Sequence, residues 1–567
     1  MGLSSDAPWT AFYGSAPVSL DYPAKTMYGM VRQSAIKHPD HTACIFMGRK
    51  TSYRALLQRI DTAAQGLLSI GIQKGDCVTI CMPNCPQALE CFYALNRIGA
   101  VSNMVHPLSA EKEIAFYLNV SRSKAILTLD QFYCKVSSIL GDLQNPTQLL
   151  VAKIADALPF PLNLAYPHTR EGRQKLPKSG YLHWRQVLAH AGTAPRLPDD
   201  TGKPEDCAAI LYSGGTTGTP KGIRLSNRNF NALALQTIAA SGYASITGMK
   251  MLSVMPIFHG FGLGIGIHTV LSGGGTCILV PRFNTKSYAA ILMKQRPALI
   301  PGVPALFEAL LRSDALKNAD LSFLRGIFCG GDSLSPELKR KVDAFLKAHG
   351  CSEQIREGYG TTECVTASCL TPKDHARAGS IGIPFPDMFY KIVAVGTTTE
   401  AAANTEGEIC ISGPTVMSGY LDDPVETTHA LRHHDDGRIW LHTGDLGYMD
   451  ADGFVYFRQR IKRVLVTSGY NVYPAQLENI LDSHEKVLLS CVIGIPDEQR
   501  GQRIKAYIVP MPGVESNDAL KEDLLRYCKA RIAKYALPRE IEFRAALPKT
   551  AVGKVAYRVL EEEAGSL

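Results

Sequence analysis

Short apolar runs alternate with amphipathic helical patterns along roughly the first 440 residues, and this alternation limits the folds open to the chain. Repeated strand–helix units build parallel sheets that are covered by helices. With 567 residues, the chain also exceeds what a single hydrophobic core organises, so at least two domains are expected. The sequence therefore predicts an α/β protein with largely parallel sheets.

One strand–helix unit illustrates the pattern. Residues 324–331, LRGIFCGG, are typical of a strand, and a helical pattern follows in which Ser335 can cap the helix and Pro336 can occupy its first position. Gly350 is expected to end this helix. Its apolar face would consist of Leu338, Val342, Phe345 and Leu346. The segment 332–335 therefore lies in a strand-to-helix loop, which is the usual ligand position in such folds.

A break in the pattern follows residues 450–453, Asp-Ala-Asp-Gly, which are typical of a turn. Beyond FVYFRQRIKR the chain resumes with strand and helix patterns, for example PAQLENILDSH. We therefore expect residues 1–458 to form a large domain of stacked, mostly parallel sheets with helices. Residues 459–567 would form a small α+β domain.

The composition is that of a globular enzyme, with 46% hydrophobic and 20% charged residues. The net charge of +8 is mild for this length and suits an anionic ligand or a weak attraction to an anionic membrane. No block of Lys and Arg indicates nucleic-acid binding, so none is expected. Among the fifteen cysteines, Cys77, Cys81 and Cys85 are spaced like metal ligands, but without a CxxC pair or a neighbouring histidine they are better explained as buried free thiols in a reducing cytosol.

Two segments bear on membranes. The longest apolar run, IFHGFGLGIGIHTVL, has only fifteen residues and includes His259 and His268, so we expect no membrane span and a cytoplasmic protein. Residues 144–198 are rich in Pro, Lys and Arg and contain the apolar stretch DALPFPLNLAYP. This region has two interpretations: a surface insertion folded onto the sheet, or an arm that contacts a membrane and collects an apolar substrate.

The glycine-rich stretch YSGGTTGTPKGIR, residues 212–224, is the clearest candidate ligand loop. It lacks the GxxxxGK[ST] spacing of a P-loop and the GxGxxG of a dinucleotide fingerprint. Glycines nevertheless let backbone N–H groups converge on an anion, and hydroxyls and a lysine add donors and charge. The residues concerned are Ser213, Gly214, Gly215, Thr216, Thr217, Gly218, Thr219 and Lys221. Because the strand-like run CAAILY precedes them, the loop is expected at the end of a strand.

The stretch YSGGTTGTPKG resembles the signature of the adenylate-forming (AMP-binding) superfamily, which includes acyl-CoA synthetases, aryl-CoA ligases, beetle luciferases and peptide-synthetase adenylation domains. Gly214 departs from the serine that is commoner there. Five further segments resemble family motifs and occur in the family's order: GGDSL, EGYGTTE, HTGD, RQRIKR and LPKTAVGK. The resemblance covers nearly the entire chain and is most specific from Tyr212 to Lys554.

The resemblance implies roles for individual residues. Tyr359 would stack on adenine, Thr362 would contact the α-phosphate, and the carboxylate of Glu363 would hold Mg²⁺. Asp445 and Arg460 would bind the ribose, and Lys554 would be the catalytic lysine. The other motif residues expected around the nucleotide, the acyl group and the pantetheine tunnel are Gly331, Asp332, Ser333, Glu357, Gly358, Gly360, Thr361, Ser468, Gly469 and Tyr470.

The implied activity uses ATP, Mg²⁺ and CoA. A carboxylate would form an acyl-AMP, and the thiol of CoA would then take the acyl group while the small domain rotates between the two halves. In MPIFHGFG, His259 would mark the mouth of the acyl pocket, with a structural histidine as the alternative. The alternate glycines that follow, from Gly260 to Gly266, would either leave room for an acyl chain or allow close backbone packing.

The substrate is expected to be a medium- or long-chain fatty acid. Amino-acid-activating members carry an aspartate after the equivalent of MPIFHGFG, which is missing here, and aryl-CoA ligases often carry a lysine where Val466 stands. The open alternatives are another carboxylate such as an aryl acid, transfer to a carrier protein, and a catalytically silent nucleotide-binding protein. The sequence indicates no particular oligomeric state.

Overall fold

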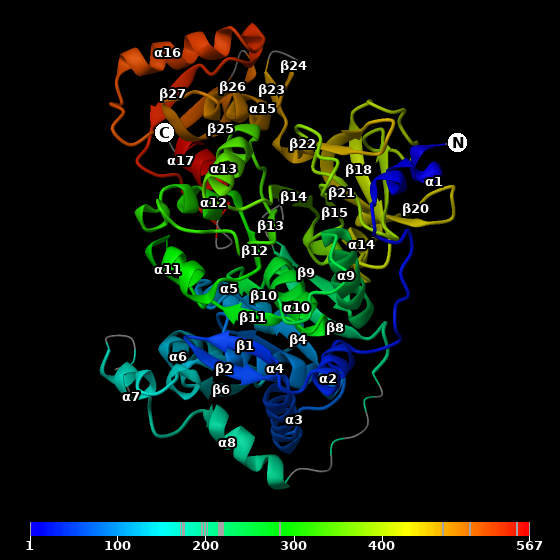
Figure 1. The fold of residues 1–567 in the computed structure, drawn as a ribbon, viewed down its shortest axis with the longest axis vertical. Coiled ribbons are helices and arrows are strands. Elements are labelled where there is room, and N and C mark those ends of the chain that lie inside the picture. Colours follow the sequence, from blue (N-terminus) through cyan, green and yellow to red (C-terminus); the bar gives the residue numbers. More distant parts are fainter. Residues whose placement is uncertain are drawn as a thin grey trace.

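A nine-stranded sheet forms the centre of the computed structural model, which describes residues 2–169, 172, 176–193, 197, 200, 202–213, 220–282, 285–467, 470–497, 500–550 and 554–565 (Figure 1). Its strands follow the order β16-β15-β14-β13-β12-β10-β11-β1-β2, and those from β14 to β1 in this order pair in parallel. The bounds are β1 Thr42–Phe46, β2 Arg49–Ser52, β10 Lys250–Ser253, β11 Thr276–Leu279, β12 Leu299–Gly302, β13 Gly326–Cys329, β14 Ile355–Tyr359, β15 Cys369–Leu370 and β16 Ile383–Pro384.

An eight-stranded sheet follows the order β19-β9-β8-β4-β3-β5-β6-β7, and its strands from β8 to β7 are parallel. Its bounds are β3 Cys77–Cys81, β4 Val101–Met104, β5 Ala125–Leu129, β6 Gln148–Ala152, β7 Leu182–His183, β8 Cys207–Ser213, β9 Lys221–Ser226 and β19 Gly419–Tyr420. The two large sheets confirm the predicted parallel α/β architecture.

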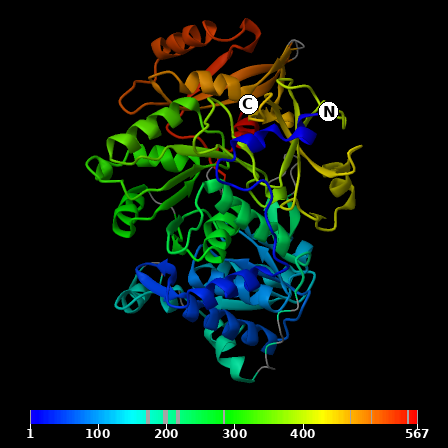
Figure 2. The ribbon, with the colours of Figure 1, turned by 45° about the vertical axis from the view of Figure 1, so that its right-hand side comes forward.

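A third sheet is antiparallel, which the alternating pattern did not indicate. It consists of β17 Phe389–Val393, β18 Gly407–Ser412, β20 Leu431–His433, β21 Ile439–Met449 and β22 Val455–Arg460. The N-terminal segment lies against it, where the amide of Ser4 donates to the Glu400 carboxylate (Figure 2).

The smaller C-terminal domain is α+β, as predicted, and lies at the end of the molecule beyond α12 and α13 (Figures 1 and 2). Its strands are β23 Leu465–Thr467, β24 Tyr470–Val472, β25 Val487–Asp497, β26 Gly501–Pro510 and β27 Glu540–Phe543, and its helices are α15 Pro474–Asp482, α16 Asp518–Lys529 and α17 Tyr557–Gly565. Two hydrophobic clusters, which draw on residues from Leu465 to Ala564, form its core separately from the main core.

Helices cover the large sheets, and none of the described helices is long and apolar enough to cross a bilayer. Their bounds are α1 Leu3–Asp6, α2 Met27–Lys37, α3 Tyr53–Ser69, α4 Pro86–Arg97, α5 Glu111–Ser121, α6 Tyr133–Ile139, α7 Leu162–Ala165, α8 Trp184–Ala189, α9 Asn227–Ser241, α10 Val270–Ser272, α11 Thr285–Gln295, α12 Pro304–Leu311, α13 Pro336–Ala348 and α14 Pro424–Ala430. The predicted unit of β13 and α13 is confirmed, because Ser335 Oγ accepts a hydrogen bond from the Leu338 amide at 3.2 Å and Gly350 has a φ of +79°.

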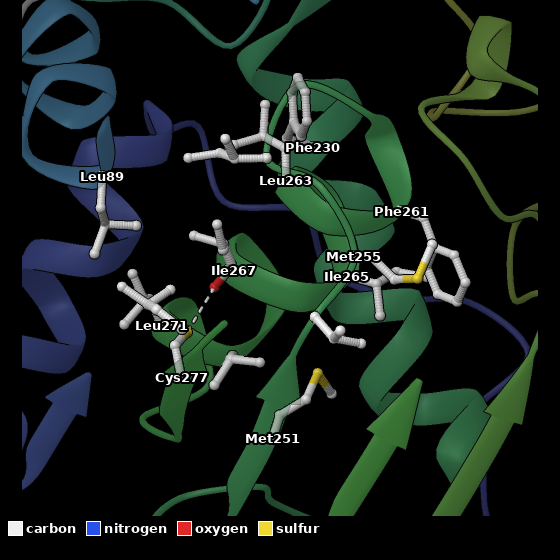
Figure 3. Packing of buried hydrophobic residues seen from close by; sticks show 14 of the residues in the cluster. Leu89, Phe230, Met251, Met255, Phe261, Leu263, Ile265, Ile267, Leu271 and Cys277 are labelled. Atoms are coloured by element: carbon white, nitrogen blue, oxygen red, sulfur yellow. Dashed lines mark hydrogen bonds between the residues drawn. The ribbon is translucent and has the colours of Figure 1, made fainter. Parts of the chain in front are cut away.

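The apolar run around His259 forms a buried π-helix, Phe261–Thr269, rather than a membrane segment. Figure 3 shows its side chains Leu263 and Ile267 in the main core, together with Phe230 of α9 and Leu89 of α4. Close backbone packing explains the first two glycines of the run: a Cβ on Gly260, just before the helix, would lie 1.7 Å from Val365 O, and one on Gly262 would lie 2.0 Å from Pro256 O.

The fold bears on two other predictions. Cys77, Cys81 and Cys85 are buried free thiols in and after β3. The described part of the segment 144–198 contributes β6 and β7 to the edge of the eight-stranded sheet, and its helix α8 packs against α3.

Candidate active site

The predicted glycine loop joins β8 and β9. These strands form an antiparallel pair at one side of the eight-stranded sheet, and their last registered partners are Ser213 and Lys221. The loop residues Gly214, Gly215, Thr216, Thr217, Gly218 and Thr219 lie outside the described residues. The hairpin therefore carries the loop at the end of a strand, as the sequence predicts.

Lys221, at the base of this loop, is linked to Glu363 through an aromatic side chain. Its Nζ forms an ion pair with Glu426 of α14 and lies 5.1 Å from the centre of the Tyr420 ring. The Tyr420 hydroxyl donates to Glu363 Oε1 at 3.0 Å. Neither Tyr420 nor Glu426 was predicted, because each is a single residue in a two-residue strand or a short helix without a motif.

The segment EGYGTTE begins in β14 and ends in a short 3₁₀ helix, Thr362–Cys364. Gly360 permits the turn between them, since a Cβ there would lie 2.2 Å from Thr366 O. Val365 follows with a φ of +67°, a conformation that is strained for a β-branched residue and is typical of functional loops. This local geometry brings Thr362 and Glu363 to the carboxyl end of the nine-stranded sheet.

Asp445 is a buried carboxylate in contact with two other predicted site residues, Tyr359 and Arg460. Its side chain is 1% exposed, Oδ2 accepts a hydrogen bond from the Tyr359 hydroxyl at 2.6 Å, and Arg460 Nε lies 2.8 Å from Oδ1. Burial raises the pKa of Asp445 although Arg460 acts against it. Oδ1 is ion-paired with Arg460 but accepts no aligned hydrogen bond from the described residues. A buried carboxylate oxygen with unused acceptor capacity fits a ligand with hydroxyl groups, such as the ribose of a nucleotide.

Lys554 reaches this site from the C-terminal domain. Burial lowers the pKa of its ammonium group, and the nearby charges that act on it are those of Asp332, Arg460 and Asp445. The Thr550 amide donates a hydrogen bond to Lys554 O at 2.7 Å. A cation that lies among acidic groups in a partly desolvated site is suited to stabilise charge on phosphoryl oxygens.

His259 lies in the same site. Burial lowers its pKa to about 4, and the charge of Lys554 contributes to this shift. The Phe261 amide donates to His259 Nδ1 at 3.2 Å, so the neutral ring carries its proton on Nε2. His259 therefore lies within the range of the charge of the candidate catalytic lysine.

The segment GGDSL lines the same edge. Gly331 has a φ of +82°, and the Ser333 amide donates to Asp332 Oδ1 at 3.0 Å. Burial raises the pKa of Glu357 to about 8, so its carboxyl group is largely protonated at neutral pH. By contrast, Tyr470 is 57% exposed and stacks on Tyr535 within the C-terminal domain. Ser468 and Gly469 lie outside the described residues.

A mainly apolar pocket adjoins this edge, and its empty space, counted out into the open solvent, is about 680 Å³. It is lined by Gly330, Gly331 and Gly358 near the site and by Met251 and Leu299 further away. Met251 of β10 is level with Leu299 of β12, which is level with Gly326 of β13. Gly330 lies four residues after Gly326, so the two ends of the cavity are about 13 Å apart along the strand direction. Figure 3 shows Met251 on β10 and Phe261 and Ile265 on the π-helix, all three of which line the cavity. Sequence alone could not place this cavity, because its walls come from distant segments.

The model of the AMP-binding enzyme family matches residues 31–421, and that of the AMP-binding enzyme C-terminal domain matches residues 476–554. The chain belongs to the AMP-binding enzyme family. A long-chain-fatty-acid–CoA ligase of Bacillus subtilis (strain 168) is 35% identical to this AMP-binding enzyme over 99% of each chain. One of Escherichia coli O157:H7 is 30% identical over 95% of each chain. The crystal structure of the anthranilate CoA ligase AuaEII in complex with anthranoyl-AMP shares the fold, with a TM-score of 0.83 and 22% identity over 98% of this chain and 99% of that one.

Proposed function

We propose that this AMP-binding enzyme activates a medium- or long-chain fatty acid with ATP and transfers the acyl group to CoA. The observation that carries the proposal is the junction of two environments at Gly330 and Gly331. An apolar cavity lies on one side, and Asp332 and Lys554 lie on the other. An acyl chain would occupy the cavity while its carboxylate meets the nucleotide. The names of the relatives from Bacillus subtilis and Escherichia coli support a fatty acid as the substrate.

In the first half-reaction, a carboxylate oxygen would form a bond to the α-phosphorus of ATP, and the bond to pyrophosphate would break. Lys554 and Thr362 would stabilise the charge that builds on the phosphoryl oxygens. Asp445 and Arg460 would hold the ribose, and the ring of Tyr359 would face the adenine. The glycine loop and Lys221 would hold the pyrophosphate end of ATP.

The carboxylate of Glu363 fits Mg²⁺, because it is an oxygen ligand at the same edge as Thr362 and Lys221. The ion, when bound, would neutralise charge on the phosphates. Tyr420, which donates to one Glu363 oxygen, would orient this carboxylate.

In the second half-reaction, the CoA thiolate would form a carbon–sulfur bond and AMP would leave with the carboxyl oxygen. We propose that residues 459–567 rotate against residues 1–458 between the halves, which would withdraw Lys554. Gln459, at this boundary, is 1% exposed, and its amide has no hydrogen-bond partner among the described residues. Such a side chain suits a position that changes its surroundings as the domains move. Ser468, Gly469 and Tyr470 would then line the pantetheine tunnel.

A pyrophosphate-release screen tests the substrate assignment. Acids of graded chain length and aryl acids are offered with ATP and Mg²⁺, with and without CoA. We expect turnover with fatty acids that rises with chain length to an optimum, because each methylene group buried in an apolar pocket contributes to binding. Turnover confined to aryl acids would contradict this assignment. Dependence on a phosphopantetheinyl protein in place of CoA would identify a carrier-protein acceptor, and no turnover with any acid would indicate a silent nucleotide-binding protein.

We also propose that the insertion, residues 144–198, contacts an anionic membrane through its exposed apolar residues between positions 160 and 164. Phe160, Leu162 and Leu164 are 79%, 43% and 61% exposed, and Lys153, earlier in the same insertion, is also exposed. Apolar side chains next to positive charge suit the interface of an anionic bilayer. Such contact would deliver an apolar substrate to the enzyme.

A vesicle flotation assay tests the membrane contact. The double variant Phe160→Ser/Leu164→Ser is expected to float several-fold less with vesicles rich in anionic phospholipid, because it loses apolar area for the interface. The control is Val18→Ser, since Val18 is 60% exposed elsewhere. Equal flotation of the parent and the double variant would contradict this proposal without affecting the assigned reaction.

A further inference from the structure

The motif residue Asp445 lies in a bulge of β21. Cys410 of β18 pairs with His442, whereas Glu408 pairs with Leu446. Two steps along β18 therefore correspond to four along β21, so β21 carries two extra residues at this point. Gly444 within the bulge has a φ of +69°, which favours glycine. The position of the Asp445 carboxylate thus depends on what holds this irregular segment.

Glu408 holds the bulge from the neighbouring strand. Its Oε1 accepts a hydrogen bond from the Gly444 amide at 2.9 Å, and its Oε2 lies 2.9 Å from His442 Nδ1. Thr443 also links the bulge to β18, because its hydroxyl donates to Ile409 O at 2.6 Å and accepts from the Asp445 amide at 3.1 Å. Glu408 is 7% exposed, so removing its carboxylate would leave the buried His442 ring and the half-buried Gly444 amide without an acceptor.

A second histidine extends this network. His434 Nε2 lies 3.0 Å from His442 Nε2. With the His442 proton on Nδ1 and donated to Glu408, His442 Nε2 accepts from the His434 ring. Burial alone would raise the pKa of Glu408, but the hydrogen bonds from His442 and from the Gly444 amide, together with the charge of Arg432, outweigh it and lower the pKa. Glu408 is therefore ionised at neutral pH and accepts both hydrogen bonds.

A bound metal ion would be a competing explanation for the clustering of polar side chains around Glu408. Ligand atoms of Glu408, Cys410 and His442 lie within 4.8 Å of one another. Both ring nitrogens of His442 already make hydrogen bonds, however, and burial raises the pKa of the Cys410 thiol, so it is neutral rather than a thiolate. These observations favour a hydrogen-bonded network.

We propose that Glu408 is a positioning residue for the ribose of ATP, which acts through Gly444 and His442 to hold the Asp445 carboxylate in place. The proposal rests on the proposed function, in which Asp445 binds the ribose hydroxyls. Glu408 bonds to Gly444 and His442 on either side of Thr443 and not to the Asp445 carboxylate itself. Its effect is therefore expected on nucleotide recognition rather than on the reacting atoms.

The test compares Glu408→Ala with Glu408→Gln in full-length enzyme. ATP and 2′,3′-dideoxy-ATP, which lacks both ribose hydroxyls, are used in the pyrophosphate-release assay. We expect Glu408→Ala to raise the KM for ATP by roughly tenfold or more, with a smaller change in kcat. Glu408→Gln should largely restore the KM, because its amide oxygen accepts from Gly444 and its NH₂ group can donate to His442 in the other tautomer. With dideoxy-ATP, the parent and Glu408→Ala should have similar KM values.

The matched control is Val393→Ala. Val393 is buried on β17 and pairs directly with Glu408, so its truncation destabilises the same place in the sheet without touching the bulge. Its thermal midpoint is expected to fall while its KM for ATP stays within about twofold of the parent, as expected for a truncation that leaves the site intact.

Each contrary outcome points to a different error. If the parent uses ATP and dideoxy-ATP equally well, the ribose assignment of the proposed function is wrong. If the parent discriminates but Glu408→Ala loses equal affinity for both nucleotides, or if Val393→Ala raises the KM as much, Glu408 has only a structural role. Stoichiometric zinc in the purified enzyme would also overturn the proposal, since Glu408 would then be a metal ligand.

Discussion

Replacing Lys554 with alanine is expected to slow acyl-adenylate formation by about 10²–10³-fold, the usual effect of removing one stabilising group from a developing oxyanion. The lysine lies in a desolvated site with Asp332, Arg460 and Asp445. There its charge acts on the phosphoryl oxygens more strongly than it would in water. Thioester formation from supplied acyl-adenylate and CoA should stay within a few-fold of the parent, because the proposed rotation withdraws Lys554 before that step.

The two half-reactions are measured separately, by pyrophosphate release and by thioester formation from the adenylate. Lys529→Ala is the matched control, since Lys529 is an exposed lysine of the same domain at the end of α16. It should leave both rates unchanged. An equal loss of both half-reactions in Lys554→Ala would contradict the assignment of this lysine to the first step and the rotation proposed with it.

Local signals explain what the sequence predicted correctly. The cap at Ser335 and the glycine at Gly350 act within one helix, so they could be identified without knowing its neighbours. The same holds for the strand β8 that precedes the glycine loop. Motifs such as EGYGTTE and HTGD likewise contain their chemistry within a few residues, and the structure brings Tyr359 and Asp445 within hydrogen-bond distance.

Other features depend on register between distant strands and carry no local signal. The bulge at Gly444 exists only relative to β18, so HTGD did not indicate that Glu408 holds it. Tyr420 and Glu426 meet Lys221 about 200 positions away along the chain, because β19 pairs with β9. The antiparallel third sheet escaped prediction for the same reason, since its strands have the same apolar character as the parallel ones.

The cavity is a further product of long-range packing, and it leads to the second large expected effect. Replacing Met251 with tryptophan should fill its far end and reduce kcat/KM for the longest accepted acids by about 10²-fold, with medium-chain acids little changed. Replacing Ala367 with phenylalanine should reduce kcat/KM for medium and long acids alike, because Ala367 lines the cavity close to Gly358 and Gly360, near the reacting carboxylate.

The measurement is the chain-length profile of kcat/KM for parent and variants in the pyrophosphate assay. Met251→Ala provides the opposite change: it enlarges the far end and should move the optimum toward longer acids, and it does not risk overpacking. Because Met251 lies about 13 Å along the strand from Gly330, its substitutions should change only the far end of the profile. A uniform loss across all chain lengths in both Met251 variants would mean that the acyl chain lies elsewhere.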